Sequence, residues 1–409
     1  MHESDAILNS AEMLGAMDDG GAIAATQRYL MNNYGSPKAS FVSGHGAVLV
    51  DESGREVLDF LAGIAVCSLG HCPEPVSRAI AEQAYKLIHT SNFFANEHAP
   101  KVAYLIDRLI SPRGDGSGRV FFANSGAEAN EAAIKLARRA AKGERSRIVA
   151  LEGGFHGRTM GALSATGQVG KRAPFEPLVP GFSHVTPGDS SALEAEFARG
   201  GVAAVILEPI LGEAGVIPVP GDFILAAREL CDRFGALLII DEIQTGFGRT
   251  GEWFGFQHVG VRPDMVTMAK AIASGFPVGA LWARDVVAAA FLPGDHGSTF
   301  GGQALAMAAA LATITTMIDI DVCSLARSKG SYLAAGLAKV PGIASVAGSG
   351  LLLGATLDEP VAAQVAARAL EIGLIVNAIG DSVLRFAPPL VVSESEIDRA
   401  LEIVAEAMS

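Results

Sequence analysis

The sequence has 409 residues, and its 31 Lys and Arg against 44 Asp and Glu give a formal net charge of −13. An acidic chain without basic clusters lacks the positive patches that nucleic acids and anionic membrane surfaces require. Half of the residues are hydrophobic and 18% are charged, which excludes a disordered chain and predicts a large buried core. We therefore expect a globular protein that binds neither nucleic acid nor membrane, and the length predicts about two to three domains.

The chain has no feature of export or membrane insertion. Its longest purely apolar run, residues 304–312, is shorter than the ~18 residues that a membrane span requires. The acidic N-terminus lacks the basic start and apolar stretch of a secretion signal. The cysteines, Cys67, Cys72, Cys231 and Cys323, have no paired spacing, which suits a reducing compartment. We expect a cytoplasmic protein in which Cys231 is buried and inert on an apolar helix face.

In chain order, the first predicted element after a loose N-terminal arm is a hairpin over residues 46–59 with a Ser-Gly turn. From about residue 119, continuous apolar runs alternate with helical patterns, as in βαβ units whose parallel strands are covered on both faces. Helical spacing from Ile224 to Phe234, followed by Gly235, predicts one crossover helix. The predicted strands are residues 120–123, 148–151, 202–207, 237–240 and 265–268.

The C-terminal part forms another block. It predicts an Ala-rich helix at 304–317, a strand at 351–355 and a closing helix from Glu394. The sequence shows no internal repeat or low-complexity linker. We expect an α/β protein with a large domain around a mostly parallel sheet and a smaller α+β domain assembled from both chain ends. The expected boundaries are residues 1–75 for the N-terminal arm and first part of the small domain, 76–305 for the large domain and 306–409 for the rest of the small domain.

A candidate phosphate site follows the predicted strand at 120–123. Ser125 and Glu128 have the spacing of a capping box, so a helix should begin here. Small residues at this start, Gly126 and Ala127, leave backbone N–H groups open at the positive end of the helix dipole, which suits a phosphate. A capped surface helix would carry the same residues.

Three predicted strands end in charged residues. Glu208 follows the strand at 202–207, Asp241 follows the strand at 237–240, and Lys270 follows the strand at 265–268 by one residue. In open α/β sheets, ligands bind at the carboxyl edge. One such residue is usually a solvated strand end. Three of them, each separated from the next by the length of a crossover connection, predict a cluster of charged side chains at one edge of the sheet.

Lys270 has an apolar setting that should lower its pKa by desolvation, and a neutral amine can form a Schiff base. A carboxylate such as Asp241 could keep a pyridine nitrogen protonated, so that the ring accepts electrons. A phosphate anchor, a pyridinium partner and a Schiff-base lysine together predict pyridoxal phosphate as the cofactor. No metal site is expected.

A competing motif lies at residues 246–251, which match the G-x-G-x-x-G dinucleotide fingerprint. Polar residues separate it from the preceding strand, and no helix pattern follows it, so the context of a dinucleotide site is absent. An NAD-dependent oxidoreductase stays a distant alternative, and a non-catalytic scaffold would have no reason to carry Asp241 and Lys270 together.

From about Tyr34 onward the chain resembles the class III, ornithine-type aminotransferases, which are fold-type I pyridoxal-phosphate enzymes. The order and spacing of the matching motifs make chance agreement very improbable. These motifs are residues 61–66 (LAGIAV), 124–130 (NSGAEAN), 154–160 (GFHGRTM), 207–210 (LEPI), 241–244 (DEIQ), 269–271 (AKA), 296–300 (HGSTF) and 384–389 (LRFAPP).

The resemblance implies a cofactor role for each matching residue. Lys270 would be the Schiff-base lysine and proton shuttle, and Asp241 would pair with the pyridine nitrogen. Thr299 would reach the cofactor phosphate of the neighbouring subunit, which makes the active unit a homodimer. The remaining implied cofactor residues are Ser125, Gly126 and Ala127 at the phosphate, Phe155 and Ile243 on the two ring faces, and Gln244 at the phenolic oxygen.

The resemblance also implies substrate-binding residues. Arg158 would clamp a substrate carboxylate, a role that suits the guanidinium fork, and Ser298 would contribute nearby. Glu208 and Arg385 would form a switch pair, in which the glutamate holds the arginine while the amino donor binds and releases it for the α-carboxylate of 2-oxoglutarate. A fixed ion pair would look the same in one structure.

Gly63 bears on the substrate, because relatives that use free ornithine have a tyrosine at the aligned position and a glycine leaves room for an N-acyl group. Cys67 and Gln303 replace asparagines that are common in relatives. We expect transfer of the terminal amino group of N2-acetylornithine to 2-oxoglutarate, giving N-acetylglutamate 5-semialdehyde and glutamate, as in arginine biosynthesis. Succinylornithine, ornithine, 4-aminobutyrate and diaminobutyrate are alternative donors.

Overall fold

A computed structural model describes residues 20–112 and 117–409. Part of the predicted N-terminal arm, residues 1–19, lies outside the described residues. The rest of it contains the short helix α2 (Ala22–Tyr29), which buries none of its residues, where the sequence predicted only a loose arm.

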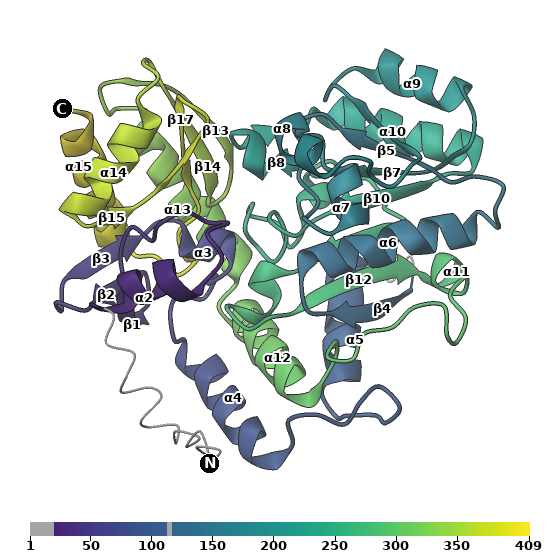
Figure 1. Cartoon of the computed structure of the whole chain (residues 1–409), viewed down its shortest axis with the longest axis horizontal. Helices are drawn as coiled ribbons and strands as arrows, with labels where there is room; N and C mark the ends of the chain where they lie inside the picture. Colours follow the sequence, from purple (N-terminus) through teal and green to yellow (C-terminus); the bar gives the residue numbers. More distant parts are fainter. Residues whose placement is uncertain (1–19, 113–116) are drawn as a thin grey trace, which may run out of the picture.

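A central sheet of seven strands dominates the molecule (Figure 1). Neighbouring strands are parallel, except that β12 runs antiparallel to both of its neighbours. The order across the sheet is β4 (Gly118–Ala123), β12 (Gly279–Arg284), β11 (Met265–Met268), β10 (Leu237–Asp241), β7 (Val202–Leu207), β5 (Arg147–Leu151) and β6 (Phe182–Val185).

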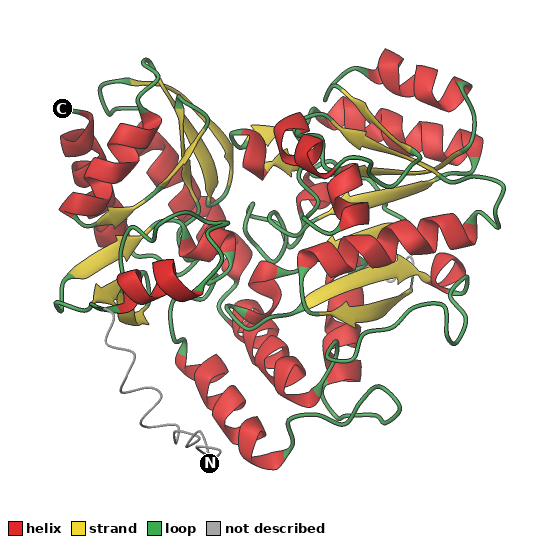
Figure 2. Ribbon diagram, viewed as in Figure 1, coloured by secondary structure: helices red, strands yellow, loops and turns green. Residues whose placement is uncertain are grey.

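The five predicted strands are confirmed, and β7 and β11 begin and end where the apolar runs do. All six residues of β7 are buried, because helices surround the central strands (Figure 2). The sequence missed β6 and β12. β6 carries Ser183 and His184 because it lies at the edge of the sheet, so it lacks the continuous apolar run of a central strand.

Within the described residues, eight helices belong to the part of the chain that builds the central sheet, and α6 to α10 lie between its strands in the sequence. The predicted crossover helix is confirmed as α10, which ends at Gly235, where a φ of 65° places the residue in the left-handed region that suits glycine. The helices are α4 (Glu74–Lys86), α5 (Ala99–Ile110), α6 (Gly126–Ala140), α7 (Met160–Ala165), α8 (Val169–Arg172), α9 (Ser190–Ala198), α10 (Gly221–Phe234) and α11 (Asp285–Ala288).

The two ends of the chain meet in a second lobe, where purple N-terminal and yellow C-terminal segments lie together (Figure 1). One sheet has the order β1 (Phe41–His45), β2 (Val48–Asp51), β3 (Glu56–Asp59) and β15 (Leu374–Ile375), so the predicted N-terminal hairpin pairs with a C-terminal strand. The other sheet has the order β13 (Ile343–Ser349), β14 (Leu352–Leu357), β17 (Val383–Phe386) and β16 (Asn377–Ile379). The predicted fold class is confirmed, and the domain boundaries stay a prediction.

Four C-terminal helices complete the fold: α12 (Ala304–Asp319), α13 (Val322–Leu337), α14 (Ala362–Ile372) and α15 (Glu394–Met408). α15 begins at the predicted residue, where Ser393 and Glu396 form a reciprocal capping box. Within residues 20–112 and 117–409, no single helix has the length and hydropathy to cross a membrane. Only α12 and α13 taken together, bent by 68°, meet that test.

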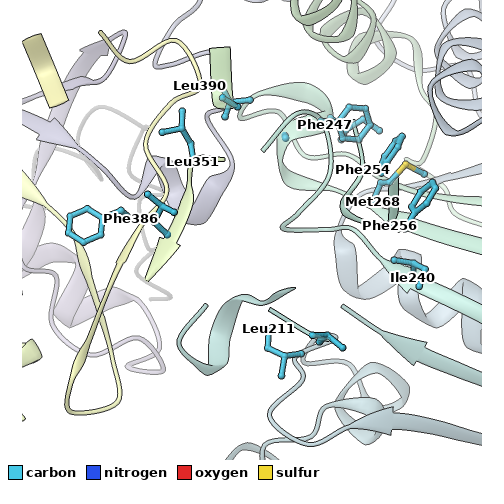
Figure 3. Packing of buried hydrophobic residues seen from close by; sticks show 14 of the residues in the cluster. Leu211, Ile240, Phe247, Phe254, Phe256, Met268, Leu351, Phe386 and Leu390 are labelled. Atoms are coloured by element: carbon cyan, nitrogen blue, oxygen red, sulfur yellow. The ribbon is translucent and has the colours of Figure 1, made fainter. Parts of the chain in front are cut away.

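One hydrophobic cluster joins the two lobes. Phe247, Phe254 and Phe256 follow the central strands, whereas Leu351 and Phe386 belong to the C-terminal lobe, and all five are buried in the same cluster (Figure 3). A shared core of this kind holds the C-terminal lobe against the carboxyl edge of the central sheet.

Candidate active site

A pocket of about 270 Å³ lies at the carboxyl edge of the central sheet. Three neighbouring strands deliver charged residues to it, because β7 ends just before Glu208, β10 ends at Asp241, and β11 ends just before Ala269 and Lys270. The structure therefore brings the predicted cluster together. The predicted residues that line the pocket are Gly126, Ala127, Phe155, Arg158, Glu208, Asp241, Ile243, Gln244 and Lys270.

Asp241 is buried and held by three hydrogen bonds. Its Oδ2 accepts from His156 Nδ1 at 2.7 Å and from Asn130 Nδ2 at 2.8 Å, and its Oδ1 accepts from the Ile243 N–H at 3.0 Å. Asn130 also donates to the carbonyl oxygen of His156 at 2.7 Å. These donors orient the carboxylate at the pocket wall. Sequence reasoning gave no role to His156 or Asn130, although both lie within the matching motifs.

Lys270 begins the 3-10 helix η4 (Lys270–Ala273) and is half-buried, with its side chain at the pocket. Burial lowers its pKa, and the charge of Arg385 adds to this effect, against the charges of Glu213, Glu208 and Asp241. The predicted direction of the shift is confirmed. Its backbone φ of 49° is unfavourable for a residue with a side chain, and such strain is common at functional positions.

The start of α6 forms one end of the pocket. Ser125 caps the helix, since its side chain accepts from the Glu128 N–H at 3.2 Å. The capping box is only half formed, because the Glu128 carboxylate accepts from the Asn124 N–H at 2.6 Å instead of from Ser125. A Cβ on Gly126 would come within 2.6 Å of the Ile243 side chain, so a larger residue here would displace Ile243.

Cations surround the ring of Phe155. Arg158 Cζ lies 5.6 Å and Lys171 Nζ lies 4.9 Å from the ring centroid. Burial lowers the pKa of Lys171, and neighbouring Arg158 and Arg385 add to the shift. The Phe155 N–H donates to Glu208 Oε1 at 2.8 Å. This end of the pocket is therefore positively charged, although the whole chain is acidic.

The predicted pairing of Arg385 with Glu208 is wrong. Arg385 is buried on β17 and pairs with Glu213, while it also donates to Gln244 Oε1 at 3.3 Å and to Asn377 Oδ1 at 2.7 Å. Burial alone would raise the pKa of Glu213, but the charge and hydrogen bond of Arg385 outweigh it and the pKa is lowered.

Glu213 reaches the pocket because the chain turns back after β7. The short strand β8 (Ile210–Leu211) pairs with β9 (Ile217–Pro218), and the 3-10 helix η2 (Gly212–Ala214) between them carries Glu213. A Cβ on Gly212 would come within 1.8 Å of Gln244 Oε1, so glycine allows this turn to approach Gln244. The sequence contains a signal for Glu213, because it follows Gly212 only a few residues after the end of a central strand.

Ser298 and Thr299 do not line this pocket. They line a larger cavity of about 1080 Å³, an open groove that also includes Phe93, Phe94 and His296. Asn124 Nδ2 donates to Ser298 Oγ at 3.2 Å. Because Asn124 precedes the cap of α6, the groove and the pocket lie close to the same loop.

Gly63 does not line the pocket either. It lies in α3 (Ala62–Ala65), a turn whose four residues have left-handed φ values of 50°, 65°, 67° and 59°. A left-handed turn costs roughly 1–2 kcal/mol for each residue with a side chain. Asp59 stabilises it, since its Oδ1 accepts from the N–H groups of Leu61 at 2.9 Å and Ala62 at 2.8 Å.

The two departures from the common pattern lie in different surroundings. Cys67 is half-buried, and its Sγ lies 4.0 Å from the position that a Cβ on Gly63 would take. Gln303 is buried, and its Oε1 accepts from the Thr90 N–H at 3.0 Å. Cys231 is buried as predicted, and burial raises its pKa to about 12.

The G-x-G-x-x-G match is structural. Residues 246–251 form successive turns, and the next helical element is only the 3-10 helix η3 (Gly255–His258). Arg249 within the match is buried and donates to the carbonyl oxygens of Leu351 and Pro388. The segment therefore ties the central sheet to the C-terminal lobe, and it lacks the helix N-terminus that a dinucleotide site requires.

Comparison with known families defines the class of the protein. Residues 29–408 match the family model described as aminotransferase class-III. The chain belongs to the class III aminotransferases, which depend on pyridoxal phosphate.

The relatives point to a narrower group. The acetylornithine aminotransferase of Corynebacterium efficiens is 46% identical over 385 residues, which cover 93% of this chain and 95% of that protein. The N-acetylornithine aminotransferase structure from Stenotrophomonas maltophilia matches with a TM-score of 0.81 and 35% identity, covering 95% of this chain and 98% of that one. The ornithine aminotransferase structure from Toxoplasma gondii, described with partial occupancy of PLP at its active site, matches with a TM-score of 0.89 and 32% identity, covering 98% and 97%.

The pocket fits this cofactor. Gly126 and Ala127 occupy the first turn of α6, where backbone N–H groups have no intrahelical acceptor and the helix dipole favours a phosphate. Asp241 supplies an oriented carboxylate for a pyridine nitrogen, and Lys270 supplies an amine whose neutral form burial favours. Phosphate donors, carboxylate and amine all line one pocket.

Proposed function

We propose that the protein transfers the terminal amino group of N2-acetylornithine to 2-oxoglutarate, giving N-acetylglutamate 5-semialdehyde and glutamate, a reaction of arginine biosynthesis. The observation that carries the proposal is the single pocket in which Lys270, Asp241 and Arg158 meet. Its support from relatives is the 44–47% identity to several acetylornithine aminotransferases over most of the chain.

Bound pyridoxal phosphate supplies an electron-accepting ring that stabilises the negative charge left on the substrate carbon when a proton is removed. Asp241 would hold the pyridine nitrogen and keep it protonated. Gly126 and Ala127 would bind the phosphate through backbone N–H groups, with Ser125 fixing the start of the helix. Phe155 and Ile243 would flank the ring, and Gln244 would bind its phenolic oxygen.

Lys270 would move the proton between the substrate carbon and the neighbouring cofactor carbon. Burial lowers its pKa, which favours the neutral amine that can accept a proton and return it. Arg158 at the pocket mouth would bind a substrate carboxylate through its guanidinium fork.

Arg385 and Glu213 account for the use of two unlike substrates. While they are paired, the positive charge of Arg385 is compensated, which suits an amino donor with an uncharged acyl group. When 2-oxoglutarate binds, its α-carboxylate would take the place of Glu213 on Arg385. Because Gln244 contacts both partners, this exchange would be felt beside the cofactor.

We also propose a cytoplasmic homodimer, in which Thr299 of the partner subunit completes the phosphate site. Support for a dimer comes from the groove that holds Thr299, because Phe93, Phe94 and Phe300 around it are 93%, 70% and 67% exposed. Large exposed aromatic side chains at one place are typical of an interface. Support for a reducing compartment comes from the four free cysteines.

Steady-state kinetics with a panel of donors tests the substrate. We expect the highest kcat/KM for N2-acetylornithine among acetylornithine, succinylornithine, ornithine, 4-aminobutyrate and diaminobutyrate, with 2-oxoglutarate as acceptor. A higher kcat/KM for free ornithine would contradict the proposal. A higher kcat/KM for succinylornithine would show that the donor is an N-acylated ornithine but that the acyl group is succinyl.

A further inference from the structure

Glu208 is a buried carboxylic acid without the partner that the sequence predicted for it. It is 5% exposed at the end of β7, and Glu213 occupies the arginine that was expected to neutralise it. No ion pair of Glu208 occurs within residues 20–112 and 117–409. The only hydrogen bond to its carboxyl group in that part of the chain comes from the Phe155 N–H at 2.8 Å. A buried charge of this kind is costly unless another group compensates it.

The nearest candidate for compensation is His156. Its side chain is fully buried, and its Nδ1 lies 2.7 Å from Asp241 Oδ2. Its other ring nitrogen, Nε2, is buried and has no hydrogen-bond partner in the described part of the chain. Because the Asp241 carboxylate only accepts, Nδ1 carries the proton of that bond. The ring therefore points an unused nitrogen away from Asp241.

Glu208 and the unused nitrogen of His156 face the same place. A Cβ added to Gly154 would lie 3.4 Å from His156 Nε2 and 3.7 Å from Glu208 Oε1, and its third neighbour would be the Leu151 carbonyl oxygen at 3.0 Å. All three are polar atoms. The glycine at 154 thus keeps side-chain carbon out of the space between the imidazole and the second carboxyl group.

The charges of the cluster agree with this geometry. Burial opposes a charged His156, but the hydrogen bond and charge of Asp241 and the charge of Glu208 outweigh it, so the pKa of His156 is raised. Burial and the charge of Asp241 raise the pKa of Glu208 to about 7, while His156 pulls it down. The other charged or titratable groups that act on this pair are Lys270, Lys171 and His184.

We propose that Glu208 is a positioning residue for the cofactor ring, which acts through His156: Glu208 and Asp241 flank the imidazole, and the imidazolium between them holds the Asp241 carboxylate toward the pyridine nitrogen. Glu208 is then not part of the substrate switch. The inference rests on the proposed function only in placing the cofactor at Asp241, since the charge of His156 is a property of the protein alone.

The test compares Glu208→Gln with Glu213→Gln. Both variants replace a glutamate by an uncharged glutamine of the same shape, and the two positions are five residues apart in the sequence. Glutamine at 208 keeps the acceptor for the Phe155 N–H and removes only the charge. In the holoenzyme, the visible absorbance of the cofactor bound at Lys270 changes with pH, and we expect Glu208→Gln to lower the midpoint of this change by roughly one pH unit. This is the effect expected for loss of a charge several ångströms away at an effective dielectric constant of about 20. Glu213→Gln should move this midpoint as well, because the charge of Glu213 also acts on Lys270, so the half-reactions and the protonation of His156 distinguish the two variants.

Half-reactions separate the two roles. Glu208→Gln should slow the reaction with the amino donor and the reaction with 2-oxoglutarate by similar factors, because both use the same ring. Glu213→Gln should change the ratio of the donor half-reaction rate to the 2-oxoglutarate half-reaction rate. Glu208→Asp keeps the charge, so its pH midpoint should lie closer to that of the unaltered enzyme than the midpoint of Glu208→Gln does. A Glu208→Gln enzyme with an unmoved midpoint and a loss confined to the 2-oxoglutarate half-reaction would overturn the proposal.

Nitrogen-15 NMR of histidine in the apoprotein makes the test independent of the proposed function. We expect His156 to be doubly protonated at pH 7 in the unaltered chain and to lose that proton at lower pH in Glu208→Gln, with Glu213→Gln as control and thermal unfolding as a check of the fold. Unchanged His156 signals in Glu208→Gln would overturn the inference. A holoenzyme without visible absorbance would overturn the proposed function instead.

Discussion

The pocket at the carboxyl edge of the central sheet and the groove beside residues 294–302 differ in how complete they are. In the pocket, Asp241 and Glu208 are buried, as is Arg385 behind Glu213 and Gln244, and each has a hydrogen-bond partner from the same chain. In the groove, Phe93, Phe94 and Thr299 are exposed, and Thr299 makes no side-chain hydrogen bond within residues 20–112 and 117–409. The difference teaches that one chain supplies the charged groups of the pocket, whereas the groove presents exposed groups that would complete the phosphate site only in the homodimer that we propose.

The largest effect should follow from Lys270→Ala, which removes the proposed proton carrier from the pocket. We expect turnover to fall by about 10³-fold or more, because positioned acid–base groups contribute 10²–10⁴-fold. Steady-state rates at saturating donor and acceptor measure it, and Lys339→Ala, an exposed lysine at the end of α13, is the control. Normal rates in Lys270→Ala would refute the assignment of the pocket.

The two regions should also respond to pH with opposite signs. Glu242, next to Asp241, accepts hydrogen bonds from the Gly255 N–H at 2.9 Å and the Phe256 N–H at 2.8 Å, yet burial raises its pKa to about 7. A raised pKa in the folded state means that stability is greatest below the unfolded value near 4.5 and is lost as pH rises through about 7. At the groove, the Leu292 N–H and then Arg139 lower the pKa of Asp295, so stability there is lost as pH falls.

Urea unfolding of the apoprotein between pH 5 and pH 8 measures this difference. We expect the free energy of unfolding to fall with rising pH, and Glu242→Gln to remove a part of that fall of up to about 3 kcal/mol, since one pKa unit is worth about 1.4 kcal/mol. Asp295→Asn should leave the slope in this range unchanged. Equal slopes in all three proteins would show that Glu242 ionises normally.

A smaller effect should follow from Gly63→Tyr, which adds bulk within the left-handed turn of α3. We expect kcat/KM for N2-acetylornithine to fall roughly 10- to 100-fold relative to free ornithine, since pocket size discriminates by about 1–3 kcal/mol. Gly63→Ala carries the same backbone cost at a φ of 65° without the bulk and should keep the preference. A tyrosine variant with unaltered preference would remove Gly63 from the specificity residues.

The smallest effect should follow from Thr299→Ala at the groove. We expect the Kd for pyridoxal phosphate to rise about tenfold, the usual worth of one hydrogen bond to a charged group. At pyridoxal phosphate concentrations below the Kd of the Thr299→Ala enzyme, mixing Thr299→Ala with Lys270→Ala subunits should raise activity, because one site of each mixed dimer then has both residues. Mixed dimers no more active than either parent would place Thr299 outside the partner's site.

Sequence reasoning succeeded where a residue's position follows from a strand end. Asp241 and Lys270 were predicted because continuous apolar strands end at or just before them, and parallel strands end at one edge. It failed for the partner of Arg385, because the β8–β9 hairpin that carries Glu213 has only two residues in each strand and no readable periodicity. It also missed the left-handed turn at Ala62–Ala65, whose first N–H groups donate to the carboxylate of nearby Asp59, because no residue pattern marks such a turn.

The central claim is that Lys270 holds the cofactor in the pocket. Borohydride reduction of the purified holoenzyme, followed by peptide mapping with mass spectrometry, tests it most directly. We expect loss of the visible absorbance and a reduced pyridoxal phosphate bound covalently to the peptide that contains Lys270. A label on another lysine, or no label in a protein that is active, would contradict it.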